Sequence, residues 1–189
     1  MVSGNWDAWL LDRVPPLPGP VADKLGEQAE WWSEQLGDEE RRFLGNLAPQ
    51  LEVAVDGASV LCVHGSPRSA TEDIFATTPD AEVSEMLDGV QQQVLAAGHT
   101  HIQLHRQHGS TLIVNPGSVG LPFYNSPADG EIFMSPWAEY AIVTAVDGQV
   151  STELRRAPYE VEAFLELARE SGMPHAHWWT DCWVKDAQA

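Results

Sequence analysis

The chain has 189 residues and a mass of 20.8 kDa, enough for one well-buried core or two small ones. Its formal net charge of −18, from 10 basic against 28 acidic residues, opposes contact with nucleic-acid backbones and anionic membranes. No apolar run nears the roughly 20 residues of a membrane helix, no signal-peptide pattern is present, and two cysteines are too few for a disulfide framework. We therefore expect a globular protein of the reducing cytoplasm, in which an anionic substrate requires a bound cation as its positive centre.

The first fifty residues predict a loop and two helices. Residues 13–20 contain four prolines and are expected to form an extended linker or loop. Residues 21–36 place apolar side chains at helical spacing, which predicts an amphipathic helix. A second helix is expected to begin with Asp38 as its cap and to stop before Pro49.

Strand patterns dominate the middle of the chain. Two apolar runs in residues 51–65 flank Asp56-Gly57, which is a strong hairpin signal. A helix is expected over residues 80–93, after Pro79, and a short strand follows from residue 94 and runs into a loop. Residues 102–118 predict a second hairpin.

The end of the chain predicts a third hairpin and a closing helix. The hairpin is expected over residues 140–156 with its turn at Asp147-Gly148, and the amphipathic helix over residues 159–172. A mixed α/β chain with so many antiparallel hairpins favours a layered sandwich over a doubly wound parallel sheet. Because no linker indicates a second unit, we expect residues 1–189 to form one domain.

Three short stretches carry candidate chemistry. They are VHG with His64, GHTH with His99 and His101, and the turn NPGS at residues 115–118. Each histidine follows a strand-like run, where α/β folds present their functional loops. Imidazole is the commonest neutral ligand of transition metals, and a His-x-His pair supplies two ligands. A single histidine after a strand is more often a packed or surface residue, so the residues alone leave both interpretations open.

Taken in order, GNWD, VHGSP, GHTH and VNPGSVGLP resemble the motifs of the calcineurin-like metallophosphoesterases, particularly the small bacterial and archaeal phosphodiesterases. The resemblance runs from Gly4 to about residue 159. It implies an α/β fold in which a β-sandwich is flanked by helices, with two divalent metal ions at the strand ends. It also implies that a hydroxide activated by the two ions hydrolyses a phosphodiester in a small phosphorylated substrate.

The resemblance further assigns metal ligands. Asn5, His64 and His99 match the ligands of one ion, and His101 matches a histidine ligand of the other. Mn, Fe, Ni and Zn all suit such donors, so the identity of the metal stays open. Asp7 is expected to order the loop that carries Asn5, and the turn at residues 115–118 is expected to shape the floor of the site.

Two departures from the family pattern bear on activity. Trp6 stands where many members have a histidine that assists catalysis, and an indole cannot act as an acid. Members also carry an Asp-x-His loop and a Gly-Asp loop before the GN motif, each after its own strand, and neither precedes Gly4. We therefore expect a domain that lacks its N-terminal strands and, in this chain alone, one weakly held metal or none.

Three functional interpretations stay open. The first is a metal-dependent phosphoesterase, and the second is a catalytically incomplete member that acts as a binding or assembly module. The third is an enzyme that receives its missing ligands from a partner chain. Missing strands would leave an unpaired sheet edge, which predicts a homo-oligomer.

Other polar residues have simpler interpretations. His105 and His108 are expected at the surface, near the turn of the second hairpin. The histidine- and tryptophan-rich residues 174–186 are expected to fold over the core rather than to bind a second metal. The Gly- and Pro-containing loop at residues 125–137 is a candidate border of a substrate cleft.

Overall fold

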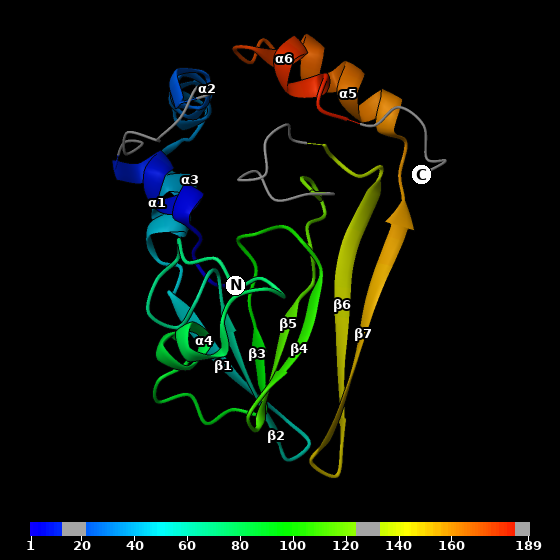
Figure 1. The fold of residues 1–189 in the computed structure, drawn as a ribbon. Helices are drawn as coiled ribbons and strands as arrows, with labels where there is room; N and C mark the ends of the chain where they lie inside the picture. The colour runs from blue at the N-terminus through cyan, green and yellow to red at the C-terminus, as the bar shows by residue number, and fades with distance from the viewer. Residues whose placement is uncertain (13–21, 124–132, 184–189) are drawn as a thin grey trace.

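The computed structural model describes residues 1–12, 22–123 and 133–183, and their centre is a five-stranded sheet (Figure 1). Its strands are β1 (Gln50–Val55), β2 (Ala58–Val63), β3 (Val94–Ala96), β4 (Leu104–His108) and β5 (Thr111–Asn115). The order is β1-β2-β3-β5-β4, with β2, β3 and β5 parallel and each outer strand antiparallel to its neighbour. The predicted linker at residues 13–20 and most of the predicted loop at residues 125–137 lie outside the described residues.

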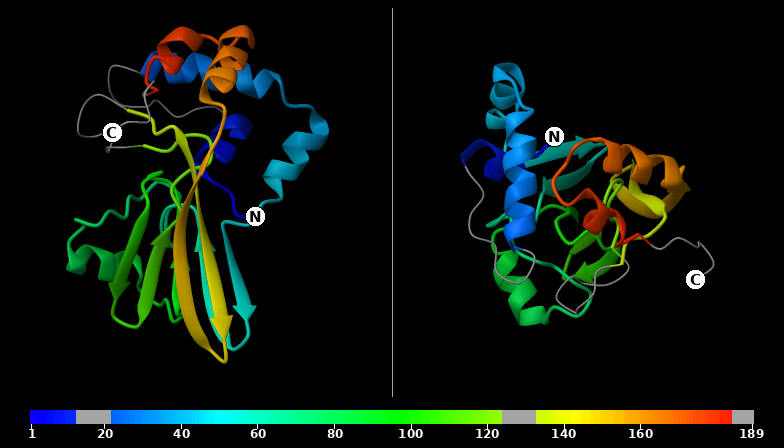
Figure 2. Two further views of the ribbon diagram at one scale, coloured as in Figure 1. Left: turned by 90° about the vertical axis from the view of Figure 1, so that its right-hand side faces the viewer. Right: turned by 90° about the horizontal axis from the view of Figure 1, so that it is seen from above.

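A long hairpin forms the second layer. Its strands, β6 (Trp137–Val146) and β7 (Gln149–Pro158), cross one face of the sheet (Figures 1 and 2). Between the two layers lies an apolar cluster that includes Val60, Val94, Val114, Ala141, Val143, Val150 and Leu154. The layered sandwich that the hairpin pattern predicted is therefore confirmed.

The opposite face of the sheet is covered by α4 (Asp80–Met86) and the loops beside it. Successive side chains of a strand point to opposite faces, so the strands contribute alternate residues to the two sides. The cluster on this face includes Leu61, Val63, Ile74, Val83, Met86, Leu95 and Ile113. Near-continuous apolar runs in β2, β3 and β5 therefore bury both faces, as parallel strands between two layers require.

The remaining helices lie beyond one end of the sheet strands. Beyond the strand ends, α1 (Asn5–Asp12), α2 (Ala22–Glu34) and α3 (Asp38–Gly45) lie on one side, and α5 (Val161–Glu170) and α6 (Ala176–Thr180) lie on the other (Figures 1 and 2). Leu165 and Trp183 are buried together, so the aromatic tail folds over the core as predicted, up to residue 183. Within the described residues, every helix is too short or too polar to cross a membrane.

Turn and cap residues explain most element boundaries. Asp56-Gly57 and Asp147-Gly148 adopt left-handed backbone angles at both positions, as tight hairpin turns require, which confirms both predicted turns. The helix expected over residues 80–93 ends at Met86, and the chain leaves it through Gly89 at φ +81°. Gly37 occupies the cap of α3, so Asp38 is its first residue rather than its cap.

Candidate metal centre

The three parallel strands end at one edge of the sheet, and the candidate residues gather there. His64 directly follows β2, and Asn115 is the last residue of β5. His99 and His101 lie in the short loop after β3. Because β2, β3 and β5 are neighbours, their carboxyl ends bring these residues together, as open α/β sheets commonly do for a site.

The loop after β3 has an unusual backbone that Asn115 holds in place. His99 and His101 have φ angles of 63° and 58°, in the left-handed region that favours glycine. The buried side-chain amide of Asn115 donates to the carbonyl of Gly98 over 2.6 Å and to Thr100 Oγ1 over 2.9 Å. Non-glycine residues in this region cost of order 1–3 kcal/mol each and persist only where surrounding contacts hold them. Asn115 therefore positions the His-x-His loop from the neighbouring strand.

Three polar side chains converge at the strand ends. Asn5 Oδ1 lies 2.8 Å from His64 Nε2, and His99 Nδ1 lies 3.3 Å from the same nitrogen. Asn5 is the first residue of α1 and is 7% exposed. Gly4 precedes it because a Cβ there would lie 3.0 Å from the His64 ring. The Gly4 amide donates to Asp7 Oδ2 over 2.7 Å, which confirms that Asp7 orders this loop.

With Asn5 Oδ1 facing His64 Nε2, hydrogen bonds leave part of this cluster unsatisfied. A neutral imidazole nitrogen carries either one proton or one lone pair in the ring plane. If His64 Nε2 carries the proton, it can serve only one of its two neighbours well. If it carries the lone pair, it faces the lone pairs of the Asn5 oxygen. A cation between the three atoms would satisfy all of them. Of the two separations from His64 Nε2, 3.3 Å lies within and 2.8 Å slightly below the roughly 3.0–3.4 Å expected between neighbouring ligands with bonds of about 2.1 Å.

The electrostatics of His64 also suit a metal ligand. Burial, reinforced by the adjacent His99 and His101, lowers the pKa of His64 from 6.5 to about 4. The ring is therefore neutral at pH 7, and its nitrogen lone pair is available to a cation.

His101 lies beside the cluster and has its own anchor. Its Nδ1 is 2.9 Å from the carbonyl oxygen of Leu121, and its ring stacks on Phe123 with centroids 5.1 Å apart. A carbonyl can only accept, so Nδ1 carries the proton and Nε2 keeps the lone pair. Burial lowers the pKa of His101, which keeps the ring neutral. The structure thus leaves one nitrogen of His101 free for a ligand role, outside the contacts that join the other three residues.

The NPGS turn packs against the buried carboxylate of Glu139, which pairs with the half-exposed Arg156. Gly117 has φ +82°, and a Cβ there would lie 2.1 Å from Glu139 Oε2. The Gly117 amide donates to Asn115 Oδ1 over 2.9 Å. Glu139 in turn accepts from Arg156 Nε over 2.9 Å. The turn therefore supports Asn115, and its role as the floor of a site stays a prediction.

Two carboxylates near the site escaped the sequence analysis. Asp73 Oδ1 lies 3.6 Å from His99 Nε2, and Glu139 supports the NPGS turn. Neither belongs to a motif. The path of its loop brings Asp73 to the site, and the position of β6 brings Glu139 there. The signal for Asp73 was slight, namely an acidic pair that closes the loop after VHGSP.

The other histidines lie outside the cluster. His105 is exposed on β4, as predicted, whereas His108 is partly buried, with Nε2 3.1 Å from Ser84 Oγ. In the tail, His175 Nε2 contacts Glu27 over 3.0 Å. The described residues contain no group of three His, Cys, Asp or Glu side chains placed to hold a metal ion. The third donor beside His64 and His99 is the side-chain amide of Asn5.

A layered α/β sandwich with amide and imidazole donors at its strand ends is the arrangement expected of a metallophosphoesterase. Residues 1–148 match the model of the calcineurin-like phosphoesterase superfamily domain, so the chain belongs to this superfamily. The superfamily comprises metal-dependent phosphoesterases, which are hydrolases.

Solved structures share the fold. A metallophosphoesterase from Sphaerobacter thermophilus is 24% identical with a TM-score of 0.68, and the match covers 96% of this chain and 75% of that one. A hypothetical protein from Pyrococcus horikoshii OT3 is 18% identical with a TM-score of 0.71, covering 92% of this chain and 68% of that one. A comparison with curated proteins finds no significant match.

Trp6, which stands where many family members have a histidine, is used for packing. Its ring makes edge-on contacts with Trp9 at 5.2 Å and with Trp32 of α2 at 5.5 Å. These contacts join α1 to α2, so the residue next to Asn5 stabilises the helix that carries the candidate ligand.

Proposed function

We propose that the chain is a metal-dependent phosphodiesterase that acts on a small phosphorylated substrate. The observation that carries this proposal is the convergence of Asn5 Oδ1 and His99 Nδ1 on His64 Nε2. The acidic composition supports a bound cation, because a chain with a net charge of −18 has few other positive groups for a phosphate.

Four residues have roles in this proposal. Asn5, His64 and His99 hold one divalent ion, and His101 Nε2 is a ligand of a second. When bound, the ions would supply Lewis acidity toward the phosphate and would activate a water as the nucleophile for hydrolysis. The chain itself keeps His64 and His101 neutral through burial, and it orients His101 through the carbonyl of Leu121. Mn, Fe, Ni and Zn all remain candidates for this donor set.

A specific observation favours a second candidate function. Within the described residues, the contacts that join Asn5, His64 and His99 to one another involve no carboxylate, since Asp73 faces the opposite nitrogen of His99. Carboxylates commonly bridge paired metal ions. Trp6 packs against Trp9 and Trp32 and does not supply a catalytic acid. In this second function the chain binds one ion and serves as a binding or assembly module without turnover. Ligands donated by another chain would restore the enzyme.

The test is metal content measured together with turnover. The protein is incubated with manganese, freed of excess ion and analysed by elemental mass spectrometry, and hydrolysis of bis(p-nitrophenyl) phosphate is compared with that of p-nitrophenyl phosphate. We expect one or two ions per chain and faster diester hydrolysis. His99→Ala should abolish both, whereas His105→Ala, at an exposed site on β4, should leave both unchanged.

Each other outcome is decisive. An ion without turnover would favour the binding module, and faster monoester hydrolysis would contradict the diester specificity. Failure to retain any ion would overturn the metal centre.

We also propose a cytoplasmic location and a homo-oligomer. The cysteines Cys62 and Cys182 are unpaired, which suits a reducing compartment. Among the described strands, β1 pairs only with β2, and its Leu51 and Val55 are 42% and 43% exposed. Exposed apolar edges of this kind pair readily with another chain.

A further inference from the structure

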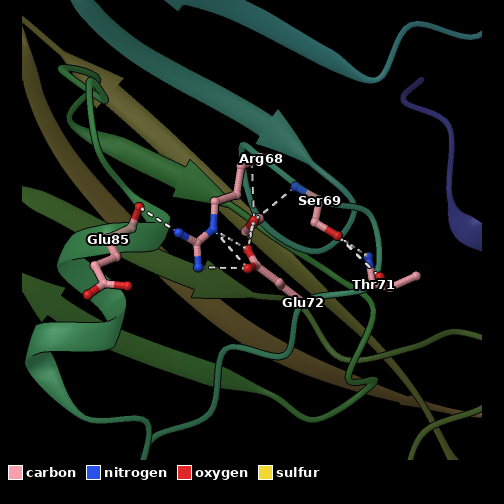
Figure 3. Close-up of polar contacts among 6 residues, drawn as sticks. Arg68, Ser69, Thr71, Glu72 and Glu85 are labelled. Atoms are coloured by element: carbon pink, nitrogen blue, oxygen red, sulfur yellow. Dashed lines mark hydrogen bonds and ion pairs between the residues drawn. The ribbon is translucent and has the colours of Figure 1, made fainter.

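The loop that follows His64 is wound tightly by its own hydrogen bonds (Figure 3). Ser66 and Ser69 exchange backbone hydrogen bonds, and the Ser66 hydroxyl also accepts from the amide of Ser69 over 3.1 Å. The Ser69 hydroxyl accepts from the amide of Thr71 over 3.2 Å. Gly65 is required at the start of the loop, because a Cβ there would lie 2.7 Å from the carbonyl oxygen of Ser69. These hydrogen bonds and the close approach at Gly65 therefore fix the backbone conformation of residues 65–71.

Arg68 and Glu72 clamp the far end of this loop. Arg68 Nε donates to both carboxylate oxygens of Glu72 over 2.8 and 3.0 Å, and the Ser66 hydroxyl donates to Glu72 as well (Figure 3). Arg68 Nη1 also donates to the carbonyl of Glu85 on α4 over 3.3 Å, which fastens the clamp to a helix of the core layer. A bidentate arginine–carboxylate pair fixes geometry better than a simple charge contact does.

The clamped residue stands next to the one that faces the metal centre. Asp73 follows Glu72 directly, and its Oδ1 lies 3.6 Å from His99 Nε2. The other nitrogen of the same ring, Nδ1, points to His64. At 3.6 Å the approach of Asp73 to Nε2 is a charge contact longer than a hydrogen bond. The negative charge opposite Nε2 still favours the tautomer with its proton on Nε2, which leaves the Nδ1 lone pair directed at the cluster.

We propose that Asp73 is a positioning residue that holds His99 in its ligand-ready tautomer, and that the clamped loop at residues 65–72 sets its place. The proposal rests on the proposed metal centre and adds a part outside the ligand set. Histidine ligands of metals usually donate their second N–H to a carboxylate or carbonyl, and loss of such a partner typically lowers metal affinity 10–100-fold.

The clamp matters because Asp73 is 54% exposed at its side chain. An exposed charge held by a flexible loop would contribute little, since ordering it costs side-chain entropy and water screens it. The clamp orders the backbone at Glu72 in advance, so only the Asp73 side chain remains to be oriented. Glu72→Gln should therefore weaken the effect of Asp73 without touching His99.

Two measurements test the proposal on the intact chain. In metal-free protein at pH 7.5, two-bond ¹H–¹⁵N spectra report which nitrogen of His99 is protonated. Manganese affinity is measured separately by titration calorimetry. Asp88→Ala, at an exposed acidic residue beside α4, is the matched control.

We expect the Nε2–H tautomer of His99 in the wild type and in Asp88→Ala. Asp73→Ala should shift the ring toward Nδ1–H and weaken manganese binding at least about 10-fold. Asp73→Asn, which keeps an acceptor oxygen, should retain more of both properties than Asp73→Ala. Glu72→Gln should give an intermediate loss.

Several results would overturn the proposal. An unchanged His99 tautomer in Asp73→Ala removes its basis, and so does a changed tautomer with wild-type manganese affinity. If the wild type binds no manganese, the proposed metal centre fails, yet the tautomer of the metal-free protein still decides whether Asp73 orients His99. Circular dichroism of each variant excludes a folding defect as the cause.

Discussion

Burial acts in opposite directions on two kinds of titratable residue around the site. It lowers the pKa of His64 to about 4, which keeps a nitrogen lone pair available. It raises the pKa of Glu139, whose side chain is only 2% exposed, although Arg156 opposes that shift. One carboxylate oxygen of Glu139 has no hydrogen-bond partner and packs against Gly117. The NPGS turn is thus supported by a carboxylate that is costly to ionise.

A pH prediction follows for Glu139. A carboxyl group whose pKa is raised by folding stabilises the fold most below its unfolded pKa, near 4.5, and loses this contribution as the pH rises through the folded value. Glu139→Gln mimics the protonated form at every pH. We therefore expect the free energy of unfolding of Glu139→Gln, relative to wild type, to increase between pH 4.5 and pH 7.5 in urea denaturation of metal-free protein. A relative decrease would mean that the Arg156 pair outweighs burial.

At the scale of elements, α5 packs the C-terminal helices onto the segment around Met134. Its amphipathic pattern places Leu165 inward, where it is 0% exposed and packs in the cluster with Met134 and Trp183. Leu167, on the outward side of the same helix, is 69% exposed. Aromatic contacts extend this cluster, with the rings of Trp179 and Trp183 only 4.4 Å apart.

This contrast gives an element-scale prediction. Leu165→Ala removes a fully buried side chain and leaves a cavity, so we expect it to lower the free energy of unfolding by about 2–5 kcal/mol. Leu167→Ala is the matched control on the same helix and should change it by less than about 0.5 kcal/mol. Urea denaturation followed by tryptophan fluorescence measures both, since Trp179 and Trp183 lie in the affected cluster. Equal effects would show that the helix does not pack as described.

At the scale of the whole molecule, a strongly acidic surface coexists with an exposed strand edge. Leu51 and Val55 are exposed on β1, which is one of the two edge strands of the five-stranded sheet in the described residues. Like charge opposes association, whereas backbone pairing and burial of these side chains favour it.

That residues 1–189 form one domain stays a prediction.

The predicted homo-oligomer can be tested at this edge. We expect light scattering coupled to size exclusion to give at least a dimer at micromolar concentration and moderate salt. Val55→Lys should shift the mass toward the monomer, because a charged residue on an edge strand disfavours pairing. Val146→Lys adds the same charge at the 60% exposed end of β6 and should leave the mass unchanged. A stable wild-type monomer would contradict the proposal.

Local patterns predicted much of this fold. Both Asp-Gly turns, the hairpins around them and α5 follow from turn chemistry and side-chain period, which depend on residues close in sequence. The ordered motifs likewise indicated the superfamily, to which residues 1–148 belong. The helix expected over residues 80–93 was too long, because the chain turns at Gly89 to reach β3.

By itself, then, the sequence determined the layered α/β class through its local patterns. It also predicted the candidate ligands, because each belongs to a short motif that resembles the family pattern. Only the tertiary structure placed Asn5 against His64, 59 positions away, and brought His99 to the same nitrogen. Only the structure placed Asp73 opposite His99 and Glu139 beneath Gly117. Such contacts depend on strand order and loop path, which arise from burial across the whole chain rather than from any local pattern.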